Sequence, residues 1–340
     1  MQQNTDIPAP NIKRLHGIGA LRYAVCVTKR SGVTKCCKTT LYVVKKQAKH
    51  QKNDFGAWLN EIKAINLWRN MHHVHQTMSI PMTNPQDLEI QSLLGHLPPI
   101  TLEQMESIKL MNRLDTKYVA TKRQLMELLK MVEGKYYVQE IGEYRICPYR
   151  TTYFDTPDHS MYMMHHNKRA RRVKVRVRTY LTSGDLTFLE VKNKNNHGRT
   201  KKKRIQVPSL ETAQQTEGAP ELVQKKAHIP FSSMHQVVQN LFDRITLVNM
   251  AKTERLTIDF NIRFHNFETG LDADSGQLVV IELKRDGNVY SPICSLLRDL
   301  HIQPTGFSKC CIGMVWTDPN LKHNNFKAKV MRLAKLNSLA

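Results

Sequence analysis

The feature that most constrains the fold is a strict alternation of side chains over residues 172–178. The odd positions are all valine, whereas the even positions are all cationic: Arg172, Lys174, Arg176 and Arg178. Because successive residues of a β-strand point to opposite faces, this segment is predicted to be a strand with one aliphatic and one cationic face. The valines can pack against helices, but the cations must face water or an anion, since like charges in a dry core are very costly.

Several other segments repeat this two-faced pattern. One charged strand face usually means simple solvent exposure, but consecutive ones, each backed by apolar residues, favour a barrel with a polar lumen. The expected class is therefore α+β, with an antiparallel β-barrel covered by helices. Strands are expected at 112–120, 149–154, 201–207 and 278–285. Polar residues of one parity also recur in 186–192, 255–263 and 281–284, where they include Glu190, Lys192, Asp259, Asn261, Arg263, Glu282 and Lys284.

Residues 1–98 differ from the rest of the chain. They are basic and weakly periodic, so they are expected to be a weakly structured N-terminal extension that ends in a linker at 81–99. One amphipathic helix is predicted within it, at 54–70.

Residues 99–318 are predicted to form the barrel domain, and residues 319–340 a basic C-terminal helix. Residues 233–244 have the apolar spacing of a helix and are predicted to be one. Two pairs have the spacing of a helix-starting capping box, Thr101 with Gln104 and Thr121 with Gln124.

The charge balance points to a polyanionic partner. The chain has 51 Lys and Arg against 29 Asp and Glu, a formal net charge of +22. Such an excess fits a nucleic acid, a phosphate-rich small molecule or an anionic membrane surface.

The cysteines and the hydropathy bear on the compartment. The seven cysteines show no CxxC spacing, so reduced thiols and a cytoplasmic location are expected. No apolar run reaches the ~18 residues of a membrane span, so none is expected.

Seven segments, in this order, resemble the VTC domain. That domain is the catalytic part of polyphosphate polymerases and belongs to the triphosphate tunnel metalloenzyme superfamily. The resemblance covers residues 100–316. Its segments are NRLDTKYV (112–119), YRTTYFDT (149–156), RRVKVRVRTYL (171–181), LTFLEVKNK (186–194), ERLTIDFNIRF (254–264), IELK (281–284) and GFSKCCIGM (306–314).

The resemblance implies a tunnel of roughly eight antiparallel strands. It also implies an ATP-dependent phosphotransferase that adds the γ-phosphoryl group to a growing polyphosphate chain with Mn²⁺ or Mg²⁺. The implied partners are ATP and inorganic polyphosphate, with no nucleic acid.

The family's functional positions carry over to particular residues of this chain. Lys252 occupies the place of a family arginine and Gly306 that of a lysine in some members. The implied catalytic residues are Arg176, Arg178, Lys192 and Lys309; the substrate-binding residues are Lys117, Lys202, Lys252, Lys284 and Ser308; the metal ligand is Glu282, with Glu190 either assisting it or pairing with an arginine.

Two alternatives stay open. Related tunnel enzymes hydrolyse triphosphates or cyclise ATP, but their Glu-x-Glu-x-Lys signature is absent from the first strand, which has Asn112, Arg113, Asp115 and Lys117 instead. A non-enzymatic nucleic-acid-binding protein also fits the charge. However, only 7% of the residues are aromatic and none lies within 171–178, so stacking on bases is disfavoured.

Overall fold

The computed structural model describes residues 13–15, 22–24, 84–106, 113–196, 200–287 and 290–339. The chain divides into two units, Met1–Ile80 and Pro81–Ala340. In the first, β1 (Lys13–Leu15) pairs with β2 (Arg22–Ala24) in antiparallel fashion. The helix predicted at 54–70 lies outside the described residues.

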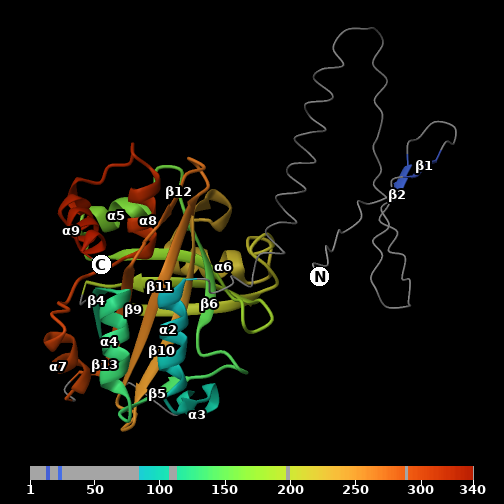
Figure 1. The fold of residues 1–340 in the computed structure, drawn as a ribbon. Coiled ribbons are helices and arrows are strands. Elements are labelled where there is room, and N and C mark those ends of the chain that lie inside the picture. The colour runs from blue at the N-terminus through green and yellow to red at the C-terminus, as the bar shows by residue number, and fades with distance from the viewer. Residues whose placement is uncertain are drawn as a thin grey trace, which may run out of the picture. The chain divides into compact units, whose positions relative to one another are not determined.

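The second unit is built on one large, mostly antiparallel sheet of 11 strands (Figure 1). Its main path runs β4-β13-β11-β10-β6-β7-β8-β9, with β12 beside β11 and β5 between β10 and β3. The antiparallel α+β class is therefore confirmed; among the described residues the sheet is open, because no ladder joins β4 to β9. The strands are β3 (Pro99–Ile100), β4 (Arg113–Thr121), β5 (Tyr136–Gln139), β6 (Cys147–Asp155), β7 (Arg172–Tyr180), β8 (Leu186–Lys194), β9 (Thr200–Val207), β10 (His235–Asn249), β11 (Glu254–Asn266), β12 (Asp272–Asp274) and β13 (Leu278–Asp286).

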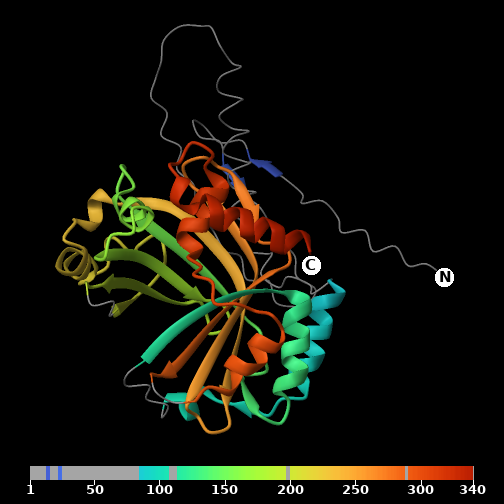
Figure 2. The same cartoon turned by 90° about the vertical axis from the view of Figure 1, so that its left-hand side faces the viewer.

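Helices cover the sheet in separate groups. α2 and α4 lie side by side along one side of the sheet, and the C-terminal helices α8 and α9 gather at another place (Figure 2). Both predicted capping boxes are present, at the starts of α3 and α4. The helices are α2 (Pro85–Gly95), α3 (Leu102–Glu106), α4 (Lys122–Val132), α5 (Ser160–His166), α6 (Ala219–Ala227), α7 (Pro292–Asp299), α8 (Lys309–Thr317) and α9 (Lys327–Ser338), with short 3-10 turns at Phe231–Ser233 and Asn324–Phe326.

The apolar residues form distinct clusters beneath these helices. Leu125 and Leu129 of α4 pack with Leu256 and Ile258 of β11. Val175 of β7 belongs to a second cluster, which the apolar side of α6 covers. The valines of β7 therefore face the helix layer, as their alternation predicted.

A β-bulge divides strand β11. Asn261 and Ile262 together lie opposite Phe242 of β10, and Asn261 has a left-handed φ of 52°. Asparagine tolerates this conformation better than other side chains with a Cβ. Beyond the bulge, each side chain points to the side of the sheet opposite to the one that simple alternation predicts. Arg263 is therefore exposed and does not continue the polar row predicted over 255–263.

Two local predictions were wrong. Residues 235–249 form strand β10 instead of a helix, because a second bulge at Val237 lets Val237 and Val238 both be buried and thus imitates helical spacing. The linker predicted at 81–99 contains helix α2, whose Ile90 and Leu94 are fully buried in the core.

A buried ion pair joins α2 to α4. Asp87 Oδ1 lies 2.7 Å from Lys122 Nζ, and the two side chains are only 8% and 3% exposed. The other carboxylate oxygen of Asp87 accepts a 3.1 Å hydrogen bond from Asn261 at the bulge, and Asn261 also donates to Asp243 over 2.8 Å. Helix α2 is therefore an integral part of this unit.

We expect Lys122→Met to lower the free energy of unfolding by about 3–5 kcal/mol, because it leaves Asp87 buried and unpaired. Urea denaturation measures this change. The matched control is Lys130→Met, since Lys130 is 48% exposed and pairs with Glu127 at 3.1 Å on the surface. The control is expected to change stability by less than about 1 kcal/mol. Equal, small losses in both variants would contradict the importance of the buried pair.

Candidate functional site

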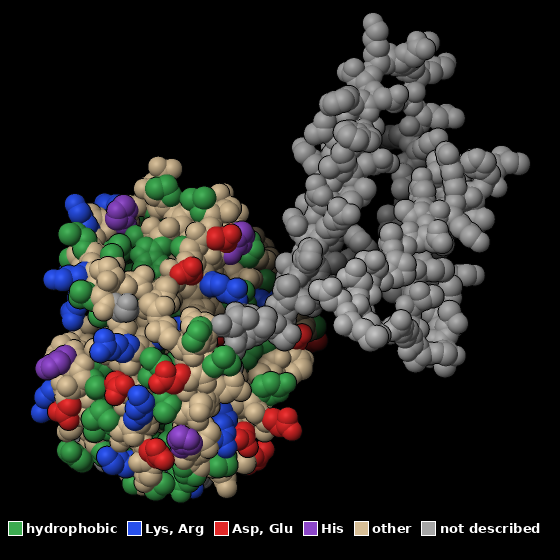
Figure 3. All heavy atoms as spheres, viewed as in Figure 1, with side chains coloured by type: hydrophobic (Ala, Val, Ile, Leu, Met, Phe, Trp, Pro, Cys, Tyr) green, Lys and Arg blue, Asp and Glu red, His purple; other side chains and the backbone are tan. Residues whose placement is uncertain are grey.

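Charged side chains gather on one face of the sheet, which we call the inner face and define by Lys117, Arg176, Glu190, Asp259 and Glu282. These residues come from β4, β7, β8, β11 and β13. On the molecular surface shown in Figure 3, by contrast, basic side chains are dispersed among acidic and apolar ones.

Glu190 of β8 is held by two cations. Arg176 donates to Glu190 Oε2 from Nη2 at 2.6 Å and from Nε at 2.8 Å, and Lys202 donates to Oε1 at 2.9 Å. Glu190 is 1% exposed. Burial alone would raise the pKa of Glu190, but Arg176, Arg178 and Lys202 together lower it well below its usual range. Both of its oxygens are thus occupied by cations.

Asp259 of β11 is also shared by two cations. Arg244 lies opposite it on β10 and donates from Nε to Oδ1 at 2.6 Å and from Nη2 to Oδ2 at 2.8 Å. Lys309, the first residue of α8, donates to the same Oδ2. Burial works against ionisation, yet the two cations keep the pKa of Asp259 below its usual range.

Glu282 of β13 is the third shared carboxylate, and its contacts are looser. Lys117 Nζ lies 3.4 Å from one oxygen and Lys284 Nζ 3.5 Å from the other. Lys117 also donates to the Phe307 carbonyl at 3.1 Å, which ties β4 to the segment before α8. The Glu282 side chain is 20% exposed, so its oxygens are more accessible than those of the other two carboxylates.

Arg178 and Lys192 form no ion pair with any described carboxylate. Arg178 donates from Nε to Thr151 Oγ1 at 3.0 Å, and its guanidinium lies 5.6 Å from the ring of Tyr149 and 5.8 Å from that of Phe242. These rings attract the cation without neutralising it. Burial and the neighbouring arginines lower the pKa of Arg178. The charge of Arg178 is therefore not neutralised by an ion pair with a described carboxylate.

The inner face therefore carries more positive than negative charge. Burial lowers the pKa of Lys309 to about 7 and the pKa values of Lys192 and Lys284 to about 8. The charges of Glu282 and Lys117 also influence the pKa of Lys192. At least eight cations face four carboxylates here, because Asp115 of β4 lies opposite Lys284 and joins the three shared carboxylates. The eight cations are Lys117, Arg176, Arg178, Lys192, Lys202, Arg244, Lys284 and Lys309.

The start of α8 brings further groups to this face. Ser308 is the N-cap of α8 and accepts from the Cys311 amide at 3.3 Å. Its Oγ also accepts a 2.7 Å hydrogen bond from Lys174 of β7. Cys311 Sγ lies 3.0 Å from His165 Nδ1 of α5. The α8 N-terminus is thus linked to both β7 and α5.

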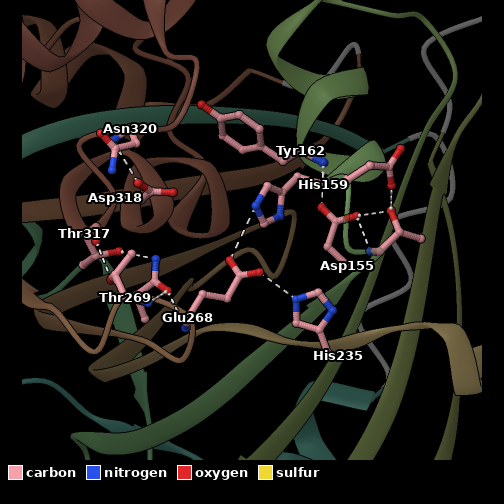
Figure 4. A network of polar contacts seen from close by, with 12 residues as sticks. Asp155, His159, Tyr162, His235, Glu268, Thr269, Thr317, Asp318 and Asn320 are labelled. Carbon is pink, nitrogen blue, oxygen red and sulfur yellow. Dashed lines mark hydrogen bonds and ion pairs between the residues drawn. The ribbon is translucent and has the colours of Figure 1, made fainter.

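A separate polar network, shown in Figure 4, fixes the loop before α5. Asp155 accepts hydrogen bonds from the amides of Met161 and Tyr162, both at 2.9 Å. Glu268 lies between two histidines, 2.7 Å from His235 Nε2 and 3.5 Å from His159 Nε2. Because α5 carries His165, this network supports the position of the α8 N-terminus indirectly.

Most of the site residues predicted from the sequence come together, whereas one does not. Lys252 is exposed in the turn between β10 and β11, with a left-handed φ of 56°. Arg244 was missed because its segment was predicted to be a helix; its match to Asp259 is recognisable only once β10 is a strand. The predicted site residues that lie on or border the inner face are Lys117, Arg176, Arg178, Glu190, Lys192, Lys202, Glu282, Lys284, Ser308 and Lys309.

The described residues contain no group of three or more His, Cys, Asp or Glu that could hold a metal by itself. Of the carboxylates on the inner face, Glu282 fits a metal ligand best, because its lysine contacts are long and its oxygens partly accessible. Glu190 fits less well, since both oxygens accept hydrogen bonds from cations. One carboxylate suffices where phosphate oxygens and water complete the coordination of Mg²⁺.

None of the described helices is long and apolar enough to cross a membrane.

Comparison with known proteins places this arrangement in a family. No curated protein matches the sequence. Among solved structures, a candidate adenylate cyclase from Bacillus halodurans is similar with 15% identity over 58% of this chain and 96% of its own, at a TM-score of 0.40. A candidate adenylyl cyclase from Hippeastrum, described as having a dominant triphosphatase activity, has 12% identity over 62% of this chain and 100% of its own, at a TM-score of 0.38. The VTC domain model matches residues 112–317, more than half of the 340 residues, and the chain therefore belongs to the VTC domain family.

Proposed function

We propose that this protein is a phosphotransferase that moves the γ-phosphoryl group of ATP onto the end of a polyphosphate chain held against the inner face. The observation that carries the proposal is the surplus of at least eight cations over four carboxylates at that face. A buried cation without a counterion is unfavourable, so this surplus favours a highly charged anionic ligand.

Arg178 and Lys192 are the groups best placed to bind the triphosphate. Arg178 lies two residues from Arg176 on β7, a spacing of ~6.6 Å along a strand that suits neighbouring phosphoryl groups. Arg176 and Lys202 remain attached to Glu190, which holds them in position. Phosphoryl transfer proceeds through a loose transition state, so positioning and cationic stabilisation supply most of the catalysis.

Lys309 and Ser308 are proposed to hold the acceptor end of the chain. They are adjacent at the start of α8, where backbone amides and the helix dipole also favour an anion. Lys309 is connected through Asp259 to Arg244, so both cations are presented together.

Glu282 is the proposed ligand for Mn²⁺ or Mg²⁺. When bound, the divalent metal neutralises charge on the bridging phosphate oxygens. Lys117 and Lys284, on either side of Glu282, keep the carboxylate ionised at neutral pH, since they lower its pKa against the effect of burial.

The lowered pKa values of the inner carboxylates, and their contacts with cations, favour transfer to phosphate over hydrolysis. Glu190 and Asp259 both have pKa values below the usual range and are bound by cations, which makes them poor bases for activating water. A terminal phosphate acceptor is already anionic and needs no such base. Triphosphate hydrolysis and ATP cyclisation remain the alternative reactions of the same site.

The activity test is incubation of the purified protein with ATP and Mn²⁺, followed by product analysis. We expect an acid-labile phosphate polymer and ADP. Arg178→Ala should lower kcat/KM by about 100-fold or more, because a preorganised donor to the transferred group is removed. Arg178→Lys should recover only part of the activity, since lysine keeps the charge but not the planar fork.

The control for this test is Arg123→Ala, because Arg123 is exposed on α4. It should leave turnover unchanged. Release of free phosphate alone would favour hydrolysis, and a cyclic nucleotide would favour cyclisation. Polymer formed at equal rates by wild type and Arg178→Ala would exclude this site.

We further expect triphosphate binding to weaken as pH rises from 7 to 9. Lys309, with a pKa of about 7, and Lys192 and Lys284, with pKa values of about 8, lose protons over this range in the free protein. A bound anion favours their charged forms, so binding takes up protons. Calorimetric titration in buffers of different ionisation enthalpy measures this uptake.

Lys309→Arg tests the assignment, because arginine stays protonated throughout. The variant should show a flatter pH dependence and a smaller proton uptake than wild type, whereas the surface control Lys130→Arg should match wild type. Affinity that is constant or increases toward pH 9 in the wild type would contradict the role of these lysines.

A further inference from the structure

Seven basic residues lie beyond the inner face at the ends of β7, β8 and β9, and the proposed mechanism does not use them. Strand pairing aligns Lys174 with Lys192 and Lys192 with Lys202 in one row across these strands. The next row outward continues with Arg172 opposite Lys194. The seven residues, which we call the strand-end surface, are Lys168, Arg169, Arg171, Arg172, Lys194, Lys201 and Lys203. Arg172 and Lys194 point to the same side of the sheet as Lys192, whereas Lys201 and Lys203 lie opposite Asn193 and Val191 and point to the other side at the sheet edge.

The strand-end surface is accessible and has no acidic partner. Lys168, Arg169, Arg171, Lys201 and Lys203 are exposed, while Arg172 and Lys194 are half-buried. None of the seven forms an ion pair with another described residue. The sequence has no Asp or Glu in 168–184 or in 191–210. Like charges so concentrated repel one another, and a polyanion would relieve that repulsion.

Part of this surface is held in a fixed position. After α5, Lys168 has a left-handed φ of 57°, and its amide donates to the His165 carbonyl at 3.1 Å. The Arg169 amide donates to the Met164 carbonyl at 3.0 Å. The basic turn is thus ordered by backbone hydrogen bonds, which reduces the entropy lost when it binds a ligand.

Protection of an edge strand explains only some of these charges. Lysines on an edge strand oppose aggregation, and β9 ends the main path of the sheet. That role accounts for Lys201 and Lys203. It does not account for Arg172 and Lys194, which lie on the interior strands β7 and β8, or for the turn at 168–171.

The surroundings identify the class of polyanion. The segments 168–174, 192–194 and 200–204 contain no aromatic residue on which a base could stack. The large apolar side chains exposed among the described residues all lie elsewhere in the chain, so no apolar anchor for a lipid surface accompanies the charge. A bare phosphate chain needs neither feature.

We infer that the strand-end surface binds the part of a linear polyphosphate chain that extends beyond the inner face. The inference rests on the proposed function, because the chain that leaves the inner face over Lys192 and Lys202 is the proposed product. It adds a second binding region that distinguishes long chains from short ones. Affinity for the chain should therefore grow with length, and its dependence on salt should become steeper as more phosphates are contacted.

The experiment compares binding of inorganic triphosphate and of long-chain polyphosphate to the full-length protein at several salt concentrations. The test variant is Arg172→Ser with Lys194→Ser, which removes the two cations of the row beyond Lys174 and Lys192 and leaves the cations of the inner face in place. The matched control is Arg123→Ser with Arg298→Ser, two exposed cations on α4 and α7, which cover a different core cluster.

We expect wild type and the control to bind the long chain at least about tenfold more tightly than triphosphate, with a steeper salt dependence for the long chain. The test variant should lose most of that difference while its affinity for triphosphate stays at the wild-type value. Unchanged long-chain affinity in the test variant overturns the inference, and so does an equal loss for both ligands, which would assign Arg172 and Lys194 to the inner face.

Two further outcomes separate this inference from the proposed function. Loss of long-chain binding in the test variant, in a protein that binds no triphosphate at all, would refute the proposed function and support a polyanion surface alone. An RNA oligonucleotide or vesicles with anionic lipid that bind as tightly as polyphosphate, with the same dependence on Arg172 and Lys194, would refute the choice of a bare phosphate chain.

Discussion

The structure depends on the sharing of each inner carboxylate between two cations. A single Arg–Glu pair would have no net charge and would attract an anionic ligand only weakly. Glu190, Asp259 and Glu282 instead each hold two basic groups, so every unit is ordered by hydrogen bonds or close contacts and keeps a positive charge. This arrangement reconciles two opposing requirements. The carboxylates limit the cost of burying the cations, and the remaining charge is directed at an anion.

Aromatic rings complete this arrangement where a further carboxylate would reduce the positive charge. The ring of Phe242 lies 4.3 Å from Lys309 Nζ and 5.2 Å from the guanidinium of Arg244, and it stacks on Tyr149 with a centroid separation of 5.4 Å. A ring face attracts cations through its quadrupole but carries no net charge. Phe242 therefore supports neighbouring cations, including Arg178, without reducing the field that a phosphate would experience.

The sequence predicted the strands in which alternation is uninterrupted and failed where a bulge changes it. The alternation at 186–192 and that at 172–178 each lie within two residues of the observed bounds of β8 and β7, because neither strand contains a bulge. β10 was mistaken for a helix because its bulge brings adjacent apolar residues to the core. The polar row of β11 was extended past Asn261 for the same reason. A bulge depends on pairing with distant strands, and alternation within one segment does not reveal it.

The residues of the candidate site were likewise predicted on regular strands and missed on the bulged strand β10. Cations on regular strands were assigned to the inner face from their parity and from the family resemblance, and the structure brings them together there. Arg244 was missed with β10, and Lys252 was favoured by its place in the family pattern although it lies in a turn. The sharing of each carboxylate between two cations could also not be predicted from the sequence, because it joins residues far apart in the chain, such as Lys309 and Asp259.

Helix α8 makes one part of the inner face charged and another part apolar. Its first residue, Lys309, contacts the charged part, whereas Cys311, Ile312 and Met314 belong to an apolar cluster with Ile262 and Phe264. The bulge at Asn261 makes this possible, because it turns Ile262 and Phe264 to the side of the sheet that α8 covers. Gly313 allows close packing, since a Cβ there would collide with the ring of Phe264. Burying a charged chain in this apolar part is unfavourable, so we expect the proposed polymer to extend toward β7, β8 and β9, which remain basic.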